Sequence, residues 1–121
     1  MAKILIVEDD EFITRMLNLR LSMRGYEIEE AVNGKEGVDK ALSGDFDLIL
    51  MDMHMPVMDG HEATLTLRNK GYKGLIVAVT ASVMSADTDK AISSGCDLYI
   101  PKPIGSDFED LVEDALAGLG T

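Results

Sequence analysis

Short apolar runs alternate along this chain with longer segments in which apolar residues recur every three or four positions. Four of the short runs are apolar almost throughout, which is typical of strands buried on both faces of a sheet. In the second run polar and apolar residues alternate, as expected for a strand buried on one side only. The five predicted strands lie at 3–7, 27–31, 48–51, 75–79 and 98–100.

The longer segments carry the apolar period and the end signals of helices. Gly25 ends the first of these helices. A third helix is expected at about 62–70, and a fourth, less apolar than the others, at about 85–94. We therefore predict five helices, one after each strand.

Capping residues mark the start of two of these helices. Asn33 followed by Glu36 is typical of a helix N-terminus, and Ser106 followed by Glu109 predicts a capping box for the last helix. That last helix has one apolar face. Strands that alternate with helices predict a parallel sheet covered by helices on both faces.

The half-exposed second strand belongs at an edge of this sheet. This favours the strand order 2-1-3-4-5, a doubly wound, flavodoxin-like α/β fold with a five-stranded parallel sheet flanked by five helices. Ligands bind such sheets beyond the carboxyl ends of the strands. Functional residues are therefore expected where the strands end.

Chemically versatile side chains follow each predicted strand except the second, which leads only to Val32 and Asn33. The predicted order brings those other strands together, so their terminal residues should converge on one edge of the sheet. In chain order these residues are Glu8, Asp9, Asp10, Asp52, Thr80 and Lys102.

Converging carboxylates repel one another unless something neutralises them. Two like charges about 4 Å apart repel by roughly 1 kcal/mol in water and about 4 kcal/mol at an effective dielectric near 20. Either the pKa values rise or a cation binds among the acids. All candidate ligands are oxygens, and the strand ends offer neither His nor Cys, so Mg²⁺ is the expected ion and Mn²⁺ should substitute.

A divalent ion beside a free carboxylate suits phosphoryl transfer, which needs positioning and charge neutralisation above all. Asp52 can attack as the nucleophile. Lys102 and the ion would neutralise the phosphoryl oxygens from two sides, while Thr80 can donate a hydrogen bond to a third oxygen. The residues thus predict formation of an aspartyl phosphate.

Four motifs carry a family resemblance. They are Ile-Leu-Ile-Val-Glu-Asp-Asp at 4–10, Met-Asp-Met-His-Met-Pro-Val-Met-Asp-Gly at 51–60, Val-Thr-Ala at 79–81 and Pro-Lys-Pro at 101–103. In order and spacing the chain resembles a receiver domain of two-component response regulators, and is most similar to receivers of hybrid histidine kinases. The resemblance implies phosphoryl transfer from a histidine kinase or histidine phosphotransfer protein, or from small donors such as acetyl phosphate.

The resemblance also implies a role for each acid. Asp52 is expected to be the phosphoacceptor, Asp9 a direct metal ligand, and Glu8 a ligand through a metal-bound water. The backbone carbonyl of His54 should complete the protein's part of the metal shell. Asp10 is a minor candidate, because it could equally cap the first helix.

Further roles in the switch follow from the resemblance. Thr80 and Lys102 match the family's phosphate-sensing hydroxyl and lysine, and Tyr99 matches an aromatic residue that moves inward on activation. A cis peptide is expected between Lys102 and Pro103. Ser82 is a minor candidate that, together with the side chain of His54, could control access of water to the phosphoryl group.

The remaining notable residues have ordinary explanations. The His54 side chain is expected at the mouth of the site, partly exposed, and His61 on a solvated helix surface. Cys96 should pack as a small apolar residue. The methionines at 51, 53, 55 and 58 fit core or loop packing. Tyr99 taken alone could be an ordinary surface residue of a strand.

Composition narrows the partners. The 121 residues predict one domain, 1–121, without an output domain, and 22 acids against 11 bases give a net charge of −11. That charge argues against direct contact with nucleic acid or anionic membranes. With one cysteine, no secretory leader and no apolar run of membrane-spanning length, the expected location is cytoplasmic. The expected signalling surface combines the helix at 85–94, the strand at 98–100 and the last helix.

Three other functions fit parts of the pattern. A flavodoxin-like electron carrier would need a Ser/Thr/Gly-rich phosphate loop after the first strand, where three acids would instead repel the phosphate. An aspartate-nucleophile phosphatase would place its acid–base residue where His54 lies. A scaffold without phosphoryl chemistry would not need the complete set of strand-end residues. We expect no conventional enzyme, only a domain that assists its own phosphorylation and slow dephosphorylation.

Overall fold

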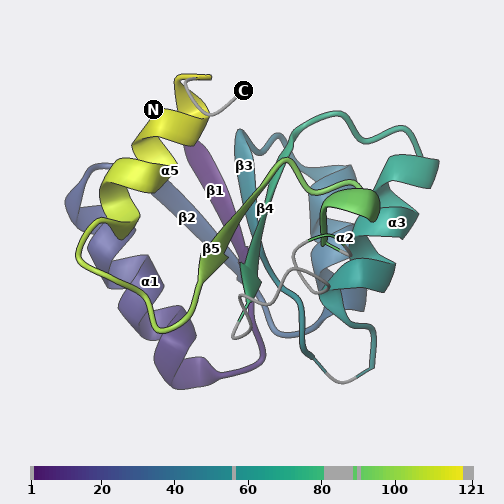
Figure 1. Cartoon of the computed structure of the whole chain (residues 1–121), viewed down its shortest axis with the longest axis horizontal. Helices are drawn as coiled ribbons and strands as arrows, with labels where there is room; N and C mark the ends of the chain where they lie inside the picture. Colours follow the sequence, from purple (N-terminus) through teal and green to yellow (C-terminus); the bar gives the residue numbers. More distant parts are fainter. Residues whose placement is uncertain (1, 56, 81–88, 90, 119–121) are drawn as a thin grey trace.

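Five parallel strands form one sheet in the order β2-β1-β3-β4-β5 (Figure 1). The computed structural model describes residues 2–55, 57–80, 89 and 91–118 of the chain. The strands are β1 (Lys3–Val7), β2 (Glu27–Ala31), β3 (Leu48–Asp52), β4 (Leu75–Thr80) and β5 (Leu98–Pro101). The predicted doubly wound order is confirmed.

Helices cover both faces of this sheet, with α1 and α5 on one face and α2 and α3 on the other (Figure 1). Their bounds are α1 Glu11–Met23, α2 Gly34–Ser43, α3 Gly60–Asn69 and α5 Phe108–Leu116. Residues 89 and 91–93 are also helical and belong to the predicted fourth helix. Ser94 already lies in a turn, and residues 85–88 and 90 of that prediction lie outside the described residues. In the described part of the chain, none of the helices has the length and apolar character needed to cross a bilayer.

Successive residues of each central strand enter opposite cores, because side chains alternate across a strand. In β1, Leu5 and Val7 pack with α2 and α3, whereas Ile4 and Ile6 pack with α1 and α5. The strands β3 and β4 alternate in the same way. Burial on both faces explains their continuous apolar runs. By contrast, β2 lies at the edge and buries only Ala31 fully, which confirms the half-exposed strand.

Helix ends follow the capping signals at two of the three predicted sites. The Asn33 side chain accepts a hydrogen bond from the Glu36 backbone N–H at 2.8 Å, and Gly25 adopts a φ of 89° just after α1. The third prediction, a capping box at Ser106 and Glu109, is wrong. Asp107 precedes α5 as its N-cap residue without a side-chain capping bond.

Glu109 instead forms an ion pair with Arg20 of α1. Its two carboxylate oxygens lie 2.6 and 2.8 Å from the guanidinium Nη2 and Nε atoms. A two-point pair between two ions is stronger than the single hydrogen bond that the Glu109 carboxylate would make in a capping box. The guanidinium also lies 5.3 Å from the centre of the Phe108 ring. This contact joins α1 to α5 over the core that they share.

We expect Glu109→Gln to destabilise the fold in a pH-dependent manner. Hydrogen bonding to Arg20 lowers the pKa of the Glu109 carboxyl from 4.5 to about 2. A lowered folded-state pKa gives stability that is complete above pH 4.5 and is lost as the pH falls toward 2. Urea unfolding should show a loss of about 1 kcal/mol at pH 7 that shrinks below pH 4.5.

Glu113→Gln is the matched control, since Glu113 pairs with Arg24 on a side chain that is 62% exposed. Its effect at pH 7 should be smaller than that of Glu109→Gln. Equal losses in the two variants would show that the Arg20 pair has no special strength.

Candidate functional site

Strand register brings the predicted site residues to one edge of the sheet. Val7 of β1 pairs with Met51 of β3, so the next residues, Glu8 and Asp52, are neighbours. The Lys102 backbone N–H donates to the Thr80 carbonyl at 2.7 Å, which joins the ends of β4 and β5. The ends of β4 and β5 therefore bring the Thr80 hydroxyl and the Lys102 ammonium to the same edge.

Glu8, Asp52 and Lys102 form a buried charged group. The Lys102 Nζ atom lies 3.1 Å from Glu8 Oε1 and 3.4 Å from Asp52 Oδ1. Both acidic residues are only 3% exposed. Burying carboxylates without an opposite charge is costly, so Lys102 holds this group together. The sequence indicated each of the three residues but not the Glu8–Lys102 ion pair.

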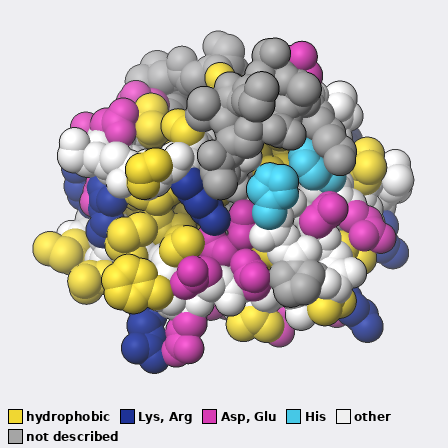
Figure 2. All heavy atoms as spheres, turned by 60° about the horizontal axis from the view of Figure 1, so that its bottom comes forward, with side chains coloured by type: hydrophobic (Ala, Val, Ile, Leu, Met, Phe, Trp, Pro, Cys, Tyr) yellow, Lys and Arg dark blue, Asp and Glu magenta, His cyan; other side chains and the backbone are white. Residues whose placement is uncertain are grey.

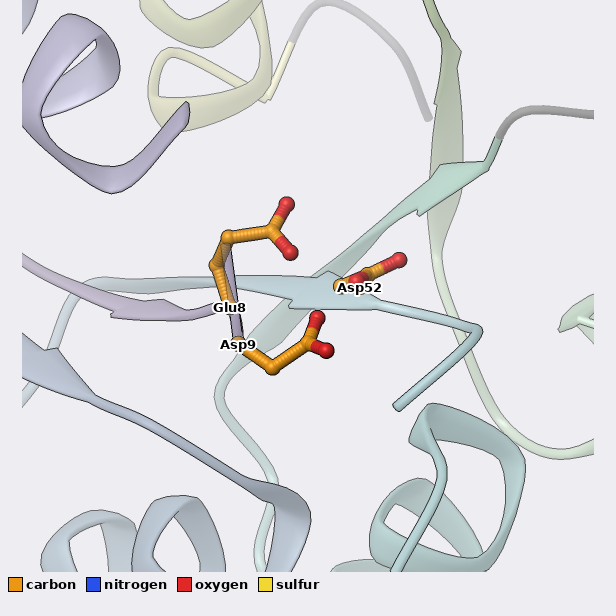
Figure 3. Close-up of side chains that lie close together, drawn as sticks. All are labelled: Glu8, Asp9 and Asp52. Carbon is orange, nitrogen blue, oxygen red and sulfur yellow. The ribbon is translucent and has the colours of Figure 1, made fainter. Parts of the chain in front are cut away.

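Asp9 adds a third carboxylate to the group. Carboxylate oxygens of Glu8, Asp9 and Asp52 all lie within 4.8 Å of one another. Figure 3 shows the Glu8 and Asp9 carboxyl groups turned toward Asp52 from the end of β1. Asp9 is exposed, so this side of the cluster is open to solvent. The converging carboxylates predicted from the sequence are confirmed.

Crowding of the charges shows in the pKa values. Burial raises the pKa of the Glu8 carboxyl above its ordinary value, and the adjacent Asp52 carboxylate raises it further, while Lys102 acts in the opposite direction. Burial of Lys102 lowers the pKa of its ammonium, but the two carboxylates together outweigh burial, and the pKa is raised. One ammonium does not fully compensate the three acids.

This cluster fits a divalent cation. Glu8 Oε1 is buried and receives no hydrogen bond from the described residues, even though Lys102 Nζ lies nearby. A buried acceptor left in this way has capacity for another ligand. The donor set is entirely carboxylate oxygen, which suits Mg²⁺ better than a softer metal. The acids can therefore hold a metal ion.

The loop after β3 is shaped by close backbone contacts. A Cβ atom on Gly60 would lie 2.2 Å from the Asp52 carbonyl oxygen, so only glycine lets α3 start so close to the site. The His54 backbone N–H donates to Asp52 Oδ1 at 3.2 Å, a contact typical of aspartate in turns that the sequence analysis missed. The His54 side chain is exposed, as predicted.

The other candidate residues differ in their contacts and in their burial. Asp10 caps α1, since its side chain accepts from the backbone N–H groups of Phe12 and Ile13 at 2.9 and 3.2 Å. Thr80 is buried at the end of β4, and Tyr99 is 46% exposed on β5. Ser82 lies outside the described residues. The peptide bond between Lys102 and Pro103 is cis, as predicted.

His61 and Cys96 are both buried. The prediction of a solvated His61 is wrong, because this residue is 8% exposed and its Nδ1 atom lies 3.3 Å from the Ser94 hydroxyl. Position 61 lies in the first turn of α3, on the side that packs against the segment before β5. Cys96 is buried in the core next to α3, as predicted. Three of the four clustered methionines are buried, and Met58 packs against the same core.

Fold and site together define a doubly wound α/β domain with an acidic cluster and a lysine at the carboxyl edge of its sheet. Figure 2 shows this edge, with acidic side chains gathered beside a basic one near its centre. The model of the response regulator receiver domain family matches residues 4–115. The chain therefore belongs to the receiver domains of two-component response regulators.

Individual relatives agree with this assignment. Hybrid signal transduction histidine kinase G of Dictyostelium discoideum is 46% identical over 107 residues, which cover 84% of this chain and 3% of the kinase. Two-component response regulator ORR41 of Oryza sativa subsp. japonica is 38% identical over 111 residues, covering 88% of this chain and 87% of the regulator. The crystal structure of response regulator TrrA from Thermotoga maritima, in complex with Mg²⁺-BeF, has a TM-score of 0.81 and 32% identity, and covers 95% of this chain and 96% of TrrA.

We expect Mg²⁺ to stabilise the folded chain, because it relieves repulsion among the clustered carboxylates. At about 100 times Kd, the free energy of unfolding should rise by about 2.7 kcal/mol. Urea unfolding with and without MgCl₂ measures this gain. Asp9→Asn should reduce it, whereas Asp45→Asn, an exposed acid just before β3 at the opposite edge, should not. An undiminished gain in Asp9→Asn would remove Asp9 from the metal site.

Proposed function

We propose that Asp52 accepts a phosphoryl group from a phosphohistidine, and that the resulting aspartyl phosphate switches the receiver domain, residues 1–121, between two conformations. The observation that carries this proposal is the buried Asp52 carboxylate, 3.4 Å from the Lys102 ammonium and next to the acidic cluster. Nucleophile, cation and metal-binding acids are the parts that phosphoryl transfer requires. In the described structure they share one edge of the sheet.

The transfer breaks the N–P bond of the phosphohistidine and forms a bond between phosphorus and an Asp52 carboxylate oxygen. The electron pair of the broken bond stays on the imidazole nitrogen, which takes up a proton from water. Hydrolysis later returns the carboxylate and releases inorganic phosphate. The domain modifies itself, so no separate substrate is turned over, and we assign it no conventional enzymatic activity.

The chain's own residues position and neutralise the reacting group. Lys102, already 3.4 Å from Asp52 Oδ1, is placed to pair with an incoming phosphoryl oxygen. The His54 backbone N–H holds the same Oδ1 atom in orientation. Thr80 would donate its hydroxyl to another phosphoryl oxygen. Lys102 and the His54 N–H already lie beside Asp52, so these two groups need little reorganisation.

Asp9 and Asp52 would hold Mg²⁺ directly, with the His54 backbone carbonyl, while Glu8 would act through a water molecule. The ion supplies neutralisation of charge on the phosphoryl oxygens, and Mn²⁺ should replace it. Complex formation of TrrA with Mg²⁺-BeF supports a magnesium site in this family.

The phosphoryl group adds about −1.5 to −2 charges and strong hydrogen-bond acceptors. Thr80 would move toward it, and Tyr99 would turn inward into the space released. This change would reach the surface formed by the segment before β5, β5 itself and α5, where a target protein would bind. Similarity to hybrid histidine kinase G supports a histidine kinase or phosphotransfer protein as the donor.

Asp52→Asn should abolish phosphorylation, since the amide lacks a nucleophilic carboxylate oxygen. The measurement is intact mass after incubation with acetyl phosphate, with and without MgCl₂. The unchanged chain should gain one phosphoryl group from acetyl phosphate only when MgCl₂ is present. Asp45→Asn should behave in the same way. A gain in mass by Asp52→Asn would place the acceptor elsewhere and refute the proposal.

Phosphorylation should also bury Tyr99, which is 46% exposed before the reaction. The chain has three tyrosines and no tryptophan, so its fluorescence reports tyrosine directly. Acetyl phosphate with Mg²⁺ should reduce quenching by acrylamide in the unchanged chain. Tyr99→Phe is the control, in which quenching of the two remaining tyrosines should not change. Equal responses in both proteins would exclude the inward movement of Tyr99.

A further inference from the structure

A closed series of contacts joins the acids of the site to its lysine by way of α1. The Asp10 backbone N–H donates to Glu8 Oε2 at 3.3 Å, and the Asp10 side chain caps the start of α1. In the last turn of the same helix, the Arg20 Nη2 atom donates to the Gly105 carbonyl at 2.8 Å. Gly105 lies on the loop that begins with Lys102, and the Lys102 ammonium returns to Glu8 Oε1 at 3.1 Å. The helix therefore holds both members of the Glu8–Lys102 ion pair.

The loop between β5 and α5, residues 102–107, is held at both of its ends. At its start, the Lys102 backbone N–H donates to the Thr80 carbonyl at 2.7 Å. Toward its end, the Gly105 carbonyl accepts from Arg20 at 2.8 Å and from the Phe108 N–H at 3.4 Å. The bond from Arg20 is the shorter of the two and is assisted by charge, so it is the stronger. Arg20 thus anchors the far end of the loop that carries the lysine.

The Arg20 guanidinium is itself well fixed. It bonds both carboxylate oxygens of Glu109 in the first turn of α5 and lies over the Phe108 ring. Its side chain is 22% exposed, so solvent screens these contacts only in part. Figure 1 shows α1 and α5 on the same face of the sheet, which allows one guanidinium to reach the helix and the loop together. A planar group with several donors suits this double contact, whereas a lysine ammonium does not.

Resting on the proposed function, we infer that Arg20 is a positioning residue for phosphoryl transfer, which acts through Gly105 to keep the Lys102 ammonium beside Asp52. The ammonium must lie where the phosphoryl oxygens arrive, and a lysine side chain is too flexible to secure this place by itself. A misplacement of about 1 Å can cost as much as a hundredfold in rate. Arg20 lies in the last turn of α1, whereas the acids precede the first, so its effect passes through the lysine.

The same geometry predicts a different effect on metal binding. The Lys102 ammonium lies among the acids and repels a divalent cation there. A loosened Lys102 should therefore slow phosphorylation while leaving Mg²⁺ bound as tightly as before, or more tightly. A general loss of structure at the site would instead weaken Mg²⁺ binding as well. These two measurements together distinguish a positioning role from a merely structural one.

The experiment compares Arg20→Gln with the unchanged chain. The initial rate of phosphorylation by acetyl phosphate at saturating MgCl₂, followed by intact mass, should fall at least about fivefold. The Kd of Mg²⁺, from titration calorimetry without a phosphoryl donor, should stay within about twofold or decrease. Urea unfolding checks that the variant is folded in both measurements. If Arg20→Gln does not fold, Arg20→Lys takes its place and should be slowed in the same way, since it keeps the charge without the forked donors.

Two further variants serve as controls. Arg24→Gln is matched in its place at the end of α1, but the described partners of Arg24 are Asp110 and Glu113 of α5, at 3.4 and 3.1 Å, and not the loop. Its phosphorylation rate should stay within about twofold of the unchanged chain. Glu109→Gln removes the ion pair of Arg20 and leaves the Gly105 carbonyl as an acceptor. It should slow phosphorylation less than Arg20→Gln does.

An unchanged rate in folded Arg20→Gln would overturn the inference. So would slowing accompanied by weaker Mg²⁺ binding, which would assign Arg20 to the general structure of the site. Equal slowing in Arg24→Gln or Glu109→Gln would also overturn it, because the contact between Arg20 and Gly105 would then not be the cause. All of these results leave the Asp52 chemistry standing. Failure of acetyl phosphate and Mg²⁺ to phosphorylate the unchanged chain would instead refute the proposed function, and the inference with it.

Discussion

Two buried carboxylates that share one ammonium are the constraint on which the rest of this structure depends. Glu8 and Asp52 lie side by side at the ends of neighbouring strands. The Lys102 Nζ atom lies 3.1 Å from Glu8 Oε1 and 3.4 Å from Asp52 Oδ1. Without the lysine, the acids would face one another in a medium of low dielectric, where repulsion is several times stronger than in water. Asp9 increases the negative charge beyond what one lysine can balance. The site is therefore suited to a cation. With that cation bound, it is also suited to an anionic group.

The sheet allows this arrangement because it is rigid where the charges meet. Strands β1, β3 and β4 are buried on both faces, and their side chains alternate between two separate cores. Residues at their carboxyl ends cannot move apart without disturbing this packing. Gly60 lets the start of α3 approach the carbonyl of Asp52, and the His54 N–H fixes one carboxylate oxygen. The acceptor is thus held on a rigid platform, while the exposed side of the cluster, at Asp9, stays open.

Local patterns in the sequence predicted much of this correctly. Apolar runs that alternate with helical periods predicted the strand order. A strand buried on both faces is apolar throughout, whereas the half-polar second strand belongs at an edge. Caps at Asn33 and Asp10 were predictable for the same reason, because each depends on a neighbour two or three positions away. The capping box at Glu109 failed because Arg20, 89 positions away in sequence, offers a stronger partner. His61 was misjudged because its burial depends on Ser94, which follows it by 33 positions.

The sequence by itself therefore determined the order of the elements, the identity of the acids and the lysine, and their position at strand ends. Those features depend on side-chain type and on period, which the chain carries locally. Only the tertiary structure decided that Glu8 pairs with Lys102 and that Glu109 binds α1 instead of capping α5. Each of these contacts joins segments far apart in the chain, and competition among partners is settled only when the packed elements fix which groups meet.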